Sequence, residues 1–173
     1  MRLARSINNF PFDLVARGSV ATIGSYDGLH RGHQELLRQV LDYGQTHGLP
    51  SVVMSFEPTP KEFFAPGRPP ARLMRFREKF EALAEFGVDV FYCPRFDDAM
   101  KNIGADTFIR RILIHSMNIR HLVIGDDFRF AQDRAGHMQM LQRAGEALGF
   151  SVEEWPSVVV DEERVSSTVI RNV

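Results

Sequence analysis

Apolar residues recur along this chain in two patterns, as short continuous runs and as longer stretches with helical spacing. The short runs predict buried strands over residues 20–23, 51–56, 88–92, 121–125 and 150–155. The helical spacing predicts helices between them, over residues 34–47, 76–86, 106–117 and 136–148. Strands that alternate with helices of this length are typical of βαβ units. We therefore predict an α/β fold in which helices flank a Rossmann-like parallel sheet.

Three segments fall outside this alternation. Residues 1–18 are predicted to be an irregular lead-in, because Pro11 and Gly18 interrupt them. Residues 57–73 contain five prolines and are predicted to form a long loop, which in a compact domain is more often functional than idle. Residues 158–165, with an acidic tip, are predicted to form a short hairpin or an irregular strand pair. No repeat or internal boundary is visible, so residues 1–173 are expected to form one domain.

Composition narrows the class of protein. Hydrophobic residues make up 44% and charged residues 25% of the chain, as in soluble globular proteins. The net charge of −1 suggests no general affinity for nucleic acid or for an anionic membrane. No apolar run has the length of a signal peptide core or of a membrane span. Cys93 is the single cysteine and can form no internal disulfide, so we expect a cytoplasmic protein.

The strongest chemical signal is VATIGSYDGLHRGHQELL, residues 20–37. It predicts a strand that ends at Gly24, a tight loop through Asp27, and a helix that begins near His30 and His33. The first turn of a helix offers unpaired N–H groups and a positive dipole end to an anion. Two imidazoles add further donors, and Gly32 between them leaves room for a nucleotide against the backbone. This pattern indicates a phosphate-handling site.

A metal site is the main alternative for the two histidines. Residues three apart on a helix can share one ion, but the usual helical zinc pair is four apart with a Glu between. No cysteine or acidic side chain lies close enough in sequence to complete such a site. We therefore predict no metal held by the protein, and a zinc hydrolase remains an alternative that metal analysis would reveal.

A second polar cluster follows the fourth predicted strand, in LVIGDDFRF, residues 122–130. That strand also ends in glycine, Gly125, and its carboxyl end should lie beside that of the first strand. Asp126 and Asp127 can accept hydrogen bonds from ribose hydroxyls, an amino group or metal-bound water. Phe128 and Phe130 could pack on a planar ring, or fold under the loop as core.

Two further segments could complete the site. In VSSTVIR, residues 165–171, Ser166, Ser167 and Thr168 predict a helix start, and the Arg171 fork suits a polyphosphate. The alternative is a simple cap with a surface arginine. In SFEPTPKEFF, residues 55–64, rigid prolines and aromatic faces suit a flat, mostly apolar ring system. The alternative places these phenylalanines in the core, and for Phe56 we favour it.

The five blocks TIGSYDGLHRGHQELL, SFEPTPKEFF, FREKFEALAEFGVD, LVIGDDFRFAQDRAG and VSSTVIR carry a family resemblance. Over residues 15–171 the chain resembles the adenylyltransferase half of bacterial bifunctional riboflavin kinase/FMN adenylyltransferase, the prokaryotic FAD synthetase. The HxGH element alone would indicate only the wider nucleotidylyltransferase superfamily. The resemblance implies conversion of ATP and FMN into FAD and pyrophosphate with Mg²⁺. The C-terminal riboflavin kinase domain, to which this half is normally fused, has no counterpart in these residues.

The resemblance also implies roles for residues. Its catalytic residues would be His30, His33 and Arg171. ATP would be bound by Gly24, Ser25, Tyr26, Asp27, His30, Gly32, His33, Gly125, Asp126, Ser166, Ser167, Thr168 and Arg171. The flavin would be bound by Phe56, Pro58, Pro60, Phe64, Asp127, Phe128 and Phe130. Mg²⁺ would be carried mainly by the ATP phosphates.

The chain departs from the family pattern at several positions. Ser25 and Tyr26 stand where Asn-Phe is common, and Thr59 where His is frequent. Ala131 replaces a frequent Gly, and Val169 a frequent Arg. These departures leave two alternatives open, a non-catalytic flavin or nucleotide carrier, and an adenylyl- or cytidylyltransferase for another phosphorylated cofactor precursor.

Overall fold

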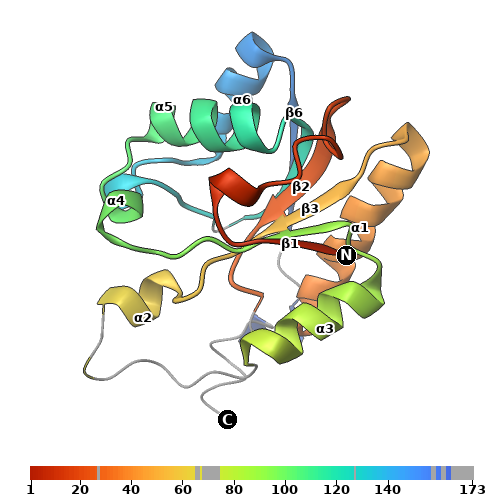
Figure 1. Ribbon diagram of the computed structural model, residues 1–173, viewed down its shortest axis with the longest axis horizontal. Helices are drawn as coiled ribbons and strands as arrows, with labels where there is room; N and C mark the ends of the chain where they lie inside the picture. Colours follow the sequence, from red (N-terminus) through yellow and green to blue (C-terminus); the bar gives the residue numbers. More distant parts are fainter. Residues whose placement is uncertain are drawn as a thin grey trace.

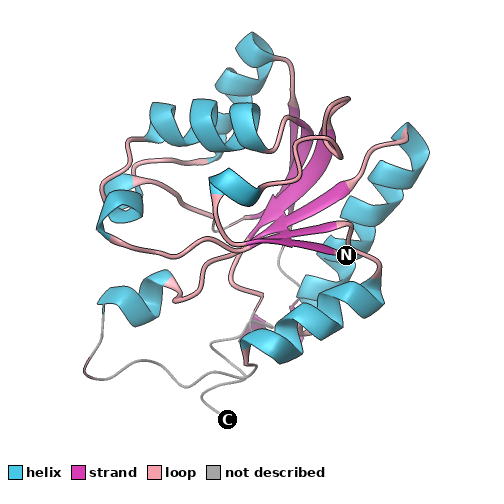
Figure 2. Cartoon of the chain, in the orientation of Figure 1, coloured by secondary structure: helices cyan, strands magenta, loops and turns pink. Residues whose placement is uncertain are grey.

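A six-stranded sheet, parallel throughout, forms the centre of the molecule (Figure 2). The computed structural model describes residues 1–26, 28–64, 67, 75–126, 128–156, 159–160 and 163–164. The strand order is β1-β4-β3-β2-β5-β6. The strands are β1 Arg2–Ala4, β2 Ser19–Ile23, β3 Ser51–Met54, β4 Val90–Tyr92, β5 Ile119–Gly125 and β6 Ser151–Trp155. The predicted α/β class with a Rossmann-like parallel sheet is confirmed.

Helices cover both faces of this sheet (Figure 1). They are α1 Arg31–His47, α2 Pro60–Phe64, α3 Phe76–Phe86, α4 Asp98–Lys101, α5 Ala105–Thr107 and α6 Met138–Leu148. A π-helical segment, Phe108–Ser116, continues α5, and short 3-10 helices lie at Ile7–Asn9 and Gln132–Arg134. In Figure 1, α1 and α3 lie on one side of the sheet, and α5 and α6 lie on the other.

Alternation of side chains along the strands divides the core into two layers. On β5, Leu122 and Ile124 pack with α6 and the π-helical segment, whereas Val123 packs with α1 and α3. On β3, Val53 likewise points away from Val52. Strands buried on both faces explain why the sequence shows continuous apolar runs rather than alternation.

The ends of the long helices follow from their glycines. Gly48, Gly87 and Gly149 have positive φ angles of 67°, 104° and 90° and cap the carboxyl ends of α1, α3 and α6. A residue in this left-handed conformation is the usual helix stop, and glycine adopts it without a steric cost. The predicted helix 76–86 therefore has the observed bounds, while the helix predicted from residue 34 begins earlier, at Arg31.

Two segments differ from the prediction. Residues 1–18 are not wholly irregular, because Arg2–Ala4 adds the outermost strand beside β4 and Ile7–Asn9 forms a 3-10 helix. The proline-rich segment is not wholly a loop, because Pro60–Phe64 is the helix α2. Thr59 and Glu62 form reciprocal hydrogen bonds at its start, with distances of 3.0 Å from the Thr59 N–H to Glu62 and 3.3 Å from the Glu62 N–H to Thr59. Such a capping box, with proline in the first helical position, outweighs the expectation of a loop.

The predicted hairpin near the carboxyl terminus is confirmed by an antiparallel pair, β7 Val159–Val160 with β8 Glu163–Arg164.

More important for a site is the centre of the main sheet. The chain leaves β2 toward β3 on one side, and β5 lies on the other side of β2. In open parallel sheets, ligands bind at the carboxyl ends of strands where the order reverses in this way.

Candidate functional site at the carboxyl edge of the sheet

The turn that follows β2 is built around a buried tyrosine. Tyr26 is only 2% exposed, and its hydroxyl forms a hydrogen bond with the hydroxyl of Thr22. Its ring lies 3.1 Å from the place that a Cβ of Gly24 would occupy, so a side chain at this position would have to displace the ring slightly. Burial raises the pKa of the Tyr26 phenol, which therefore stays protonated. Because the side chain of Tyr26 is buried, a contact with a nucleotide would have to involve its backbone, and that contact stays a prediction.

His30 ends this turn and caps helix α1. Its Nδ1 accepts hydrogen bonds from the backbone N–H groups of Gly32, at 3.1 Å, and of His33, at 3.4 Å. A neutral imidazole that accepts at Nδ1 carries its proton on Nε2. Burial lowers the pKa of His30, which favours this neutral form. His30 can therefore donate one hydrogen bond, from Nε2, while it holds the helix start.

His33 lies directly against His30. The two rings are stacked with centroids 3.7 Å apart and an angle of 23° between their planes. The ring of Tyr26 supports His33 from its edge, at a centroid distance of 5.1 Å. No acidic residue occupies the first turn of α1, and the exposed Arg31 pairs with Glu35 one turn later, at 3.1 Å. Imidazole donors and the positive end of a helix dipole together suit a phosphate group.

The end of β5 lies beside the turn that follows β2, as the sequence predicts. β5 pairs in parallel with β2, so Gly125 and Asp126 follow a strand end at the same edge of the sheet. Asp126 is exposed, and the chain then turns through a hydrogen bond of 3.2 Å from the Phe128 N–H to the Gly125 carbonyl. The expected meeting of the two strand ends is confirmed.

Phe130 belongs to the core rather than to an open wall. Its side chain is 6% exposed, and its ring lies 5.0 Å from that of Phe108 and 5.7 Å from that of Phe128. The backbone of Phe130 pairs with Gly136, whose missing Cβ leaves space for the ring. The structure thus agrees with the alternative in which Phe130 folds under the loop as core, and a flavin contact through the small accessible part of this ring stays a prediction. Phe128 is half-buried beside it.

An aromatic cluster lies on the segment after β3. Phe56, Phe63 and Phe64 surround Phe96 edge to face, with centroid distances of 5.4, 5.3 and 5.8 Å. Phe64, at the end of α2, is 61% exposed, and the amino group of Lys101 lies 6.0 Å from the centre of its ring. The partly buried Phe56 packs on the core, as the alternative reading favoured.

Phe96 and Lys101 are members of this cluster that the sequence did not single out. Phe96 follows β4 in a segment with no apolar period, and Lys101 ends the four-residue helix α4. Their proximity to Phe64 depends on the order of the strands, which places β4 beside β3. Pro58 and Pro60 precede and open α2, and both are half-buried.

Six predicted site residues, Asp27, Asp127, Ser166, Ser167, Thr168 and Arg171, lie outside the described residues. Their roles stay predictions. Within the described part of the chain, no group of three or more His, Cys, Asp or Glu side chains could hold a metal ion. This agrees with the engagement of His30 Nδ1 as a helix cap, which leaves that atom unavailable as a ligand.

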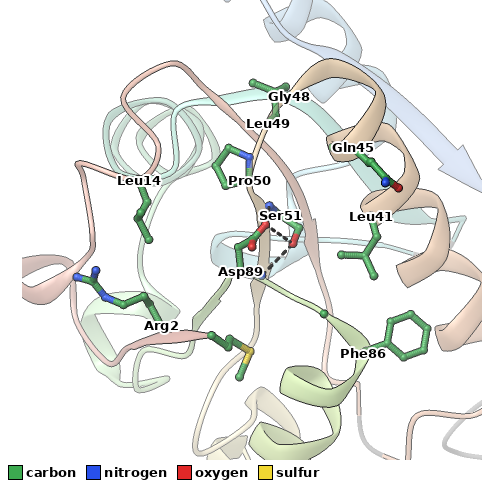
Figure 3. A pocket seen from close by; sticks show the side chains of 13 residues that line it. Arg2, Leu14, Leu41, Gln45, Gly48, Leu49, Pro50, Ser51, Phe86 and Asp89 are labelled. Atoms are coloured by element: carbon green, nitrogen blue, oxygen red, sulfur yellow. Dashed lines mark hydrogen bonds between the residues drawn. The ribbon is translucent and has the colours of Figure 1, made fainter.

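A cavity of about 720 Å³ opens at the opposite edge of the sheet (Figure 3). It is bounded by the amino ends of the strands and the carboxyl ends of α1 and α3, with Leu14, Leu41 and Phe86 among its lining residues. Asp89 accepts hydrogen bonds from the N–H of Ser51, at 2.8 Å, and from its hydroxyl, at 3.1 Å. None of the predicted site residues lines this cavity.

Comparison with known proteins adds a family. A family model described as FAD synthetase matches residues 13–169. The chain is 44% identical to the bifunctional riboflavin kinase/FMN adenylyltransferase of Pseudomonas fluorescens, over 99% of this chain and 54% of that protein. Proteins of the same name from Escherichia coli K12 and Haemophilus influenzae are 42% and 40% identical, over 54% and 55% of their lengths. The chain thus spans about half the length of these relatives.

A solved structure shares the fold. The crystal structure described as a macrolide-efflux protein from Streptococcus pneumoniae matches with a TM-score of 0.80 and 25% identity, over 98% of this chain and 54% of that one. Among the described residues, no helix is both long and apolar enough to cross a membrane.

Proposed function

Because this chain belongs to the FAD synthetase family, we propose that it is an FMN adenylyltransferase, which transfers AMP from ATP to the phosphate of FMN. The observation that carries the proposal is the stacked pair His30 and His33 at the start of α1, directly after β2. A family match over residues 13–169 includes this pair and the aromatic segment after β3.

The reaction needs positioning and charge stabilisation rather than a covalent enzyme intermediate. An oxygen of the FMN phosphate attacks the α-phosphorus of ATP and forms the new P–O bond of FAD. The bond between the α-phosphorus and the bridging oxygen breaks in line, and pyrophosphate leaves with those electrons. Negative charge grows on the phosphate oxygens during this exchange, so fixed hydrogen-bond donors lower the barrier.

The described residues can supply such donors. His30 would donate from Nε2 to an ATP phosphate, since its Nδ1 is committed to the helix cap. His33, stacked on it, would donate to the same developing charge. The N-terminus of α1 would add a positive potential. Ser166, Ser167, Thr168 and Arg171 would hold the leaving pyrophosphate, and this part of the assignment rests on the family resemblance.

The flavin would lie over the aromatic cluster after β3. Phe64 offers an exposed ring face, and Phe96 supports it from the edge. Pro58 and Pro60 would shape the same wall, and Phe56 would serve as its base. A flat ring system gains most from broad apolar contact of this kind. Asp127 and Phe128 remain predicted contacts.

Magnesium would arrive with ATP rather than in a cage made by the protein. Mg²⁺ usually keeps several waters and binds through substrate phosphates rather than in a dedicated protein cage. When bound, Mg²⁺ neutralises part of the charge on the phosphates. In the named relatives, a riboflavin kinase activity accompanies the adenylyltransferase, so a riboflavin kinase is the proposed source of FMN.

Chromatography of a reaction mixture tests the proposal. The chain is incubated with ATP, Mg²⁺ and FMN, and FAD and pyrophosphate are quantified together. We expect the two products in equal amounts, and no FAD when riboflavin replaces FMN, because riboflavin lacks the attacking phosphate. Tight binding of both substrates without either product would identify a carrier instead. Pyrophosphate release with another phosphorylated acceptor, but not with FMN, would identify a transferase of different specificity.

A further inference from the structure

A lysine is buried beneath the turn that precedes the two histidines. Lys79 lies on α3, on the face that packs toward the sheet, and is 3% exposed. Its amino group donates a hydrogen bond of 2.7 Å to the backbone carbonyl of Ser25. Lysine is rarely buried, because its amino group loses water unless the protein replaces it. A leucine would fill this place in an amphipathic helix, so the amino group itself calls for an explanation.

The carbonyl of Ser25 is held from two sides. Besides Lys79, the hydroxyl of Ser55, which directly follows β3, donates a hydrogen bond of 3.3 Å to this carbonyl. The peptide between Ser25 and Tyr26 is planar and trans, so its N–H points away from its carbonyl. The two donors therefore fix the orientation of this peptide plane.

That peptide leads directly to the histidines. Tyr26 has a positive φ of 49°, a conformation that a bulky residue adopts only when its surroundings hold it there. The Tyr26 ring meets the His33 ring with centroids 5.1 Å apart, and His33 stacks on His30 at 3.7 Å. A continuous series of contacts thus runs from Lys79 through Ser25 and Tyr26 to both imidazoles.

We propose that Lys79 is a positioning residue for adenylyl transfer, which holds the Ser25 carbonyl and thereby sets the turn on which His33 and His30 meet the ATP phosphates. This inference rests on the proposed function, and Lys79 itself touches no substrate in it. It assigns a role in the reaction to α3, a helix that otherwise contributes apolar packing through Leu83.

The test compares Lys79→Met with a matched control on the same helix. Methionine keeps most of the volume of lysine and removes the donor. Arg77→Met makes the same kind of change at a side chain that is 89% exposed. For each variant, FAD formation, affinity for Mg-ATP by calorimetry, affinity for FMN by flavin fluorescence, and the melting temperature are measured.

Lys79→Met should lower the turnover number roughly 10²-fold and weaken Mg-ATP binding, because small displacements of catalytic groups cost rate steeply. FMN affinity and melting temperature should stay near the values of the unchanged protein, as should every property of Arg77→Met. Unchanged turnover and Mg-ATP affinity in Lys79→Met would overturn the proposal. The proposal would also be overturned if Lys79→Met lost FMN affinity as strongly as Mg-ATP affinity and its melting temperature fell as well. That result would indicate a general packing role.

Two milder variants keep the test decisive if Lys79→Met folds poorly. Lys79→Gln retains a donor and should lose less turnover than Lys79→Met, and Ser55→Ala removes only the longer of the two hydrogen bonds. Wild-type turnover in both would overturn the proposal. If the unchanged protein binds Mg-ATP but makes no FAD, the proposed function fails, and the Mg-ATP affinity of the variants still decides whether Lys79 sets the turn.

Discussion

At the scale of single residues, we assign His30 two tasks, one for each of its ring nitrogens. Nδ1 accepts the backbone hydrogen bonds that begin α1, and Nε2 is left to donate. Protonation of the ring would convert Nδ1 into a donor and break the cap. The lowered pKa of His30, caused by burial, is therefore consistent with a residue that works in its neutral form.

Substitution separates these two tasks. His30→Ala should lower both stability, by about 0.5–2 kcal/mol for a lost cap, and the rate of FAD formation. His30→Asn should recover the stability, because asparagine caps helices well, but not the rate. Urea unfolding and turnover, measured on both variants, check this. If His30→Asn restored turnover, the donor role of Nε2 would be excluded.

His33→Ala should act mainly on the reaction. Loss of one donor to a developing charge typically lowers the turnover number roughly 10²–10³-fold. The His33 imidazole is not the cap of the helix. The backbone N–H of His33 donates to His30, and this hydrogen bond does not depend on the side chain of His33. Single-turnover measurements with saturating ATP and FMN give the comparison. A variant close to wild-type turnover would remove His33 from the mechanism.

The loss of folding stability at acidic pH should depend on His121. Burial lowers the pKa of this histidine, and neighbouring Glu153 and His47 act in opposite directions on it. Its ring stacks on Tyr43 at 3.9 Å, and Nδ1 bonds Ser151 at 2.6 Å. The unfolded chain takes up a proton below about pH 6.5 that the folded chain resists, so the free energy of unfolding should fall as the pH falls through this value and stay flat above it.

Denaturant unfolding between about pH 5 and pH 8 measures this dependence. His121→Gln should weaken the slope below about pH 6.5 without abolishing it, because His30 has a pKa lowered in the same direction. The variant should also lose some stability above that pH with the Ser151 hydrogen bond. An identical slope in both proteins would show that His121 is not the residue responsible.

At the scale of elements, α2 carries the exposed ring assigned to the flavin. Phe64→Ala should raise the KM for FMN with little change in stability, because its side chain is 61% exposed. Leu14→Ala is the control, an exposed apolar side chain that lines the cavity at the other edge. Initial rates over a range of FMN concentrations compare the two. If the KM for FMN rose in Leu14→Ala, or did not rise in Phe64→Ala, the flavin would have to bind at another place.

The long elements could be predicted because each repeats its pattern. Residues 76–86 show helical spacing over three turns and end at Gly87, and residues 121–125 form a continuous apolar run. The short elements could not. β1 has three residues, too few to show a period, and it forms because β4 offers an open edge. The helix α2 was not predicted because the prolines around it indicated a loop, although Thr59-Pro60 with Glu62 is itself a helix-start signal.

The candidate site shows the same division. The sequence predicted that the ends of β2 and β5 would meet, since that depends only on parallel strands. It did not reveal that Tyr26 is buried, and it left Phe130 open between a ring contact and the core, because both lie in loops where no period reports the direction of a side chain. Lys79 and Phe96 escaped notice for a different reason. Their contacts cross from one element to another, and only the packed fold brings those elements together.

At the scale of the whole molecule, the two edges of the sheet differ in chemistry. The carboxyl edge gathers the imidazole pair, Asp126 and the aromatic cluster, whereas the amino edge holds the large cavity. We propose that the reaction takes place at the carboxyl edge, because donors and a helix start converge there. A substitution that fills the cavity, such as Gln45→Trp, should therefore leave the reaction unchanged.

Adenylyl transfer at the carboxyl edge can be followed through radioactive phosphorus from ATP labelled at its α-phosphate. The unchanged chain, His33→Ala and Gln45→Trp are incubated with labelled ATP, Mg²⁺ and FMN, and the products are separated. We expect label in FAD and none in pyrophosphate, at equal rates in the unchanged chain and Gln45→Trp, and roughly 10²–10³-fold slower in His33→Ala. Label that stays in ATP, or transfer that His33→Ala leaves intact while Gln45→Trp abolishes it, would show that this edge of the sheet does not carry the reaction.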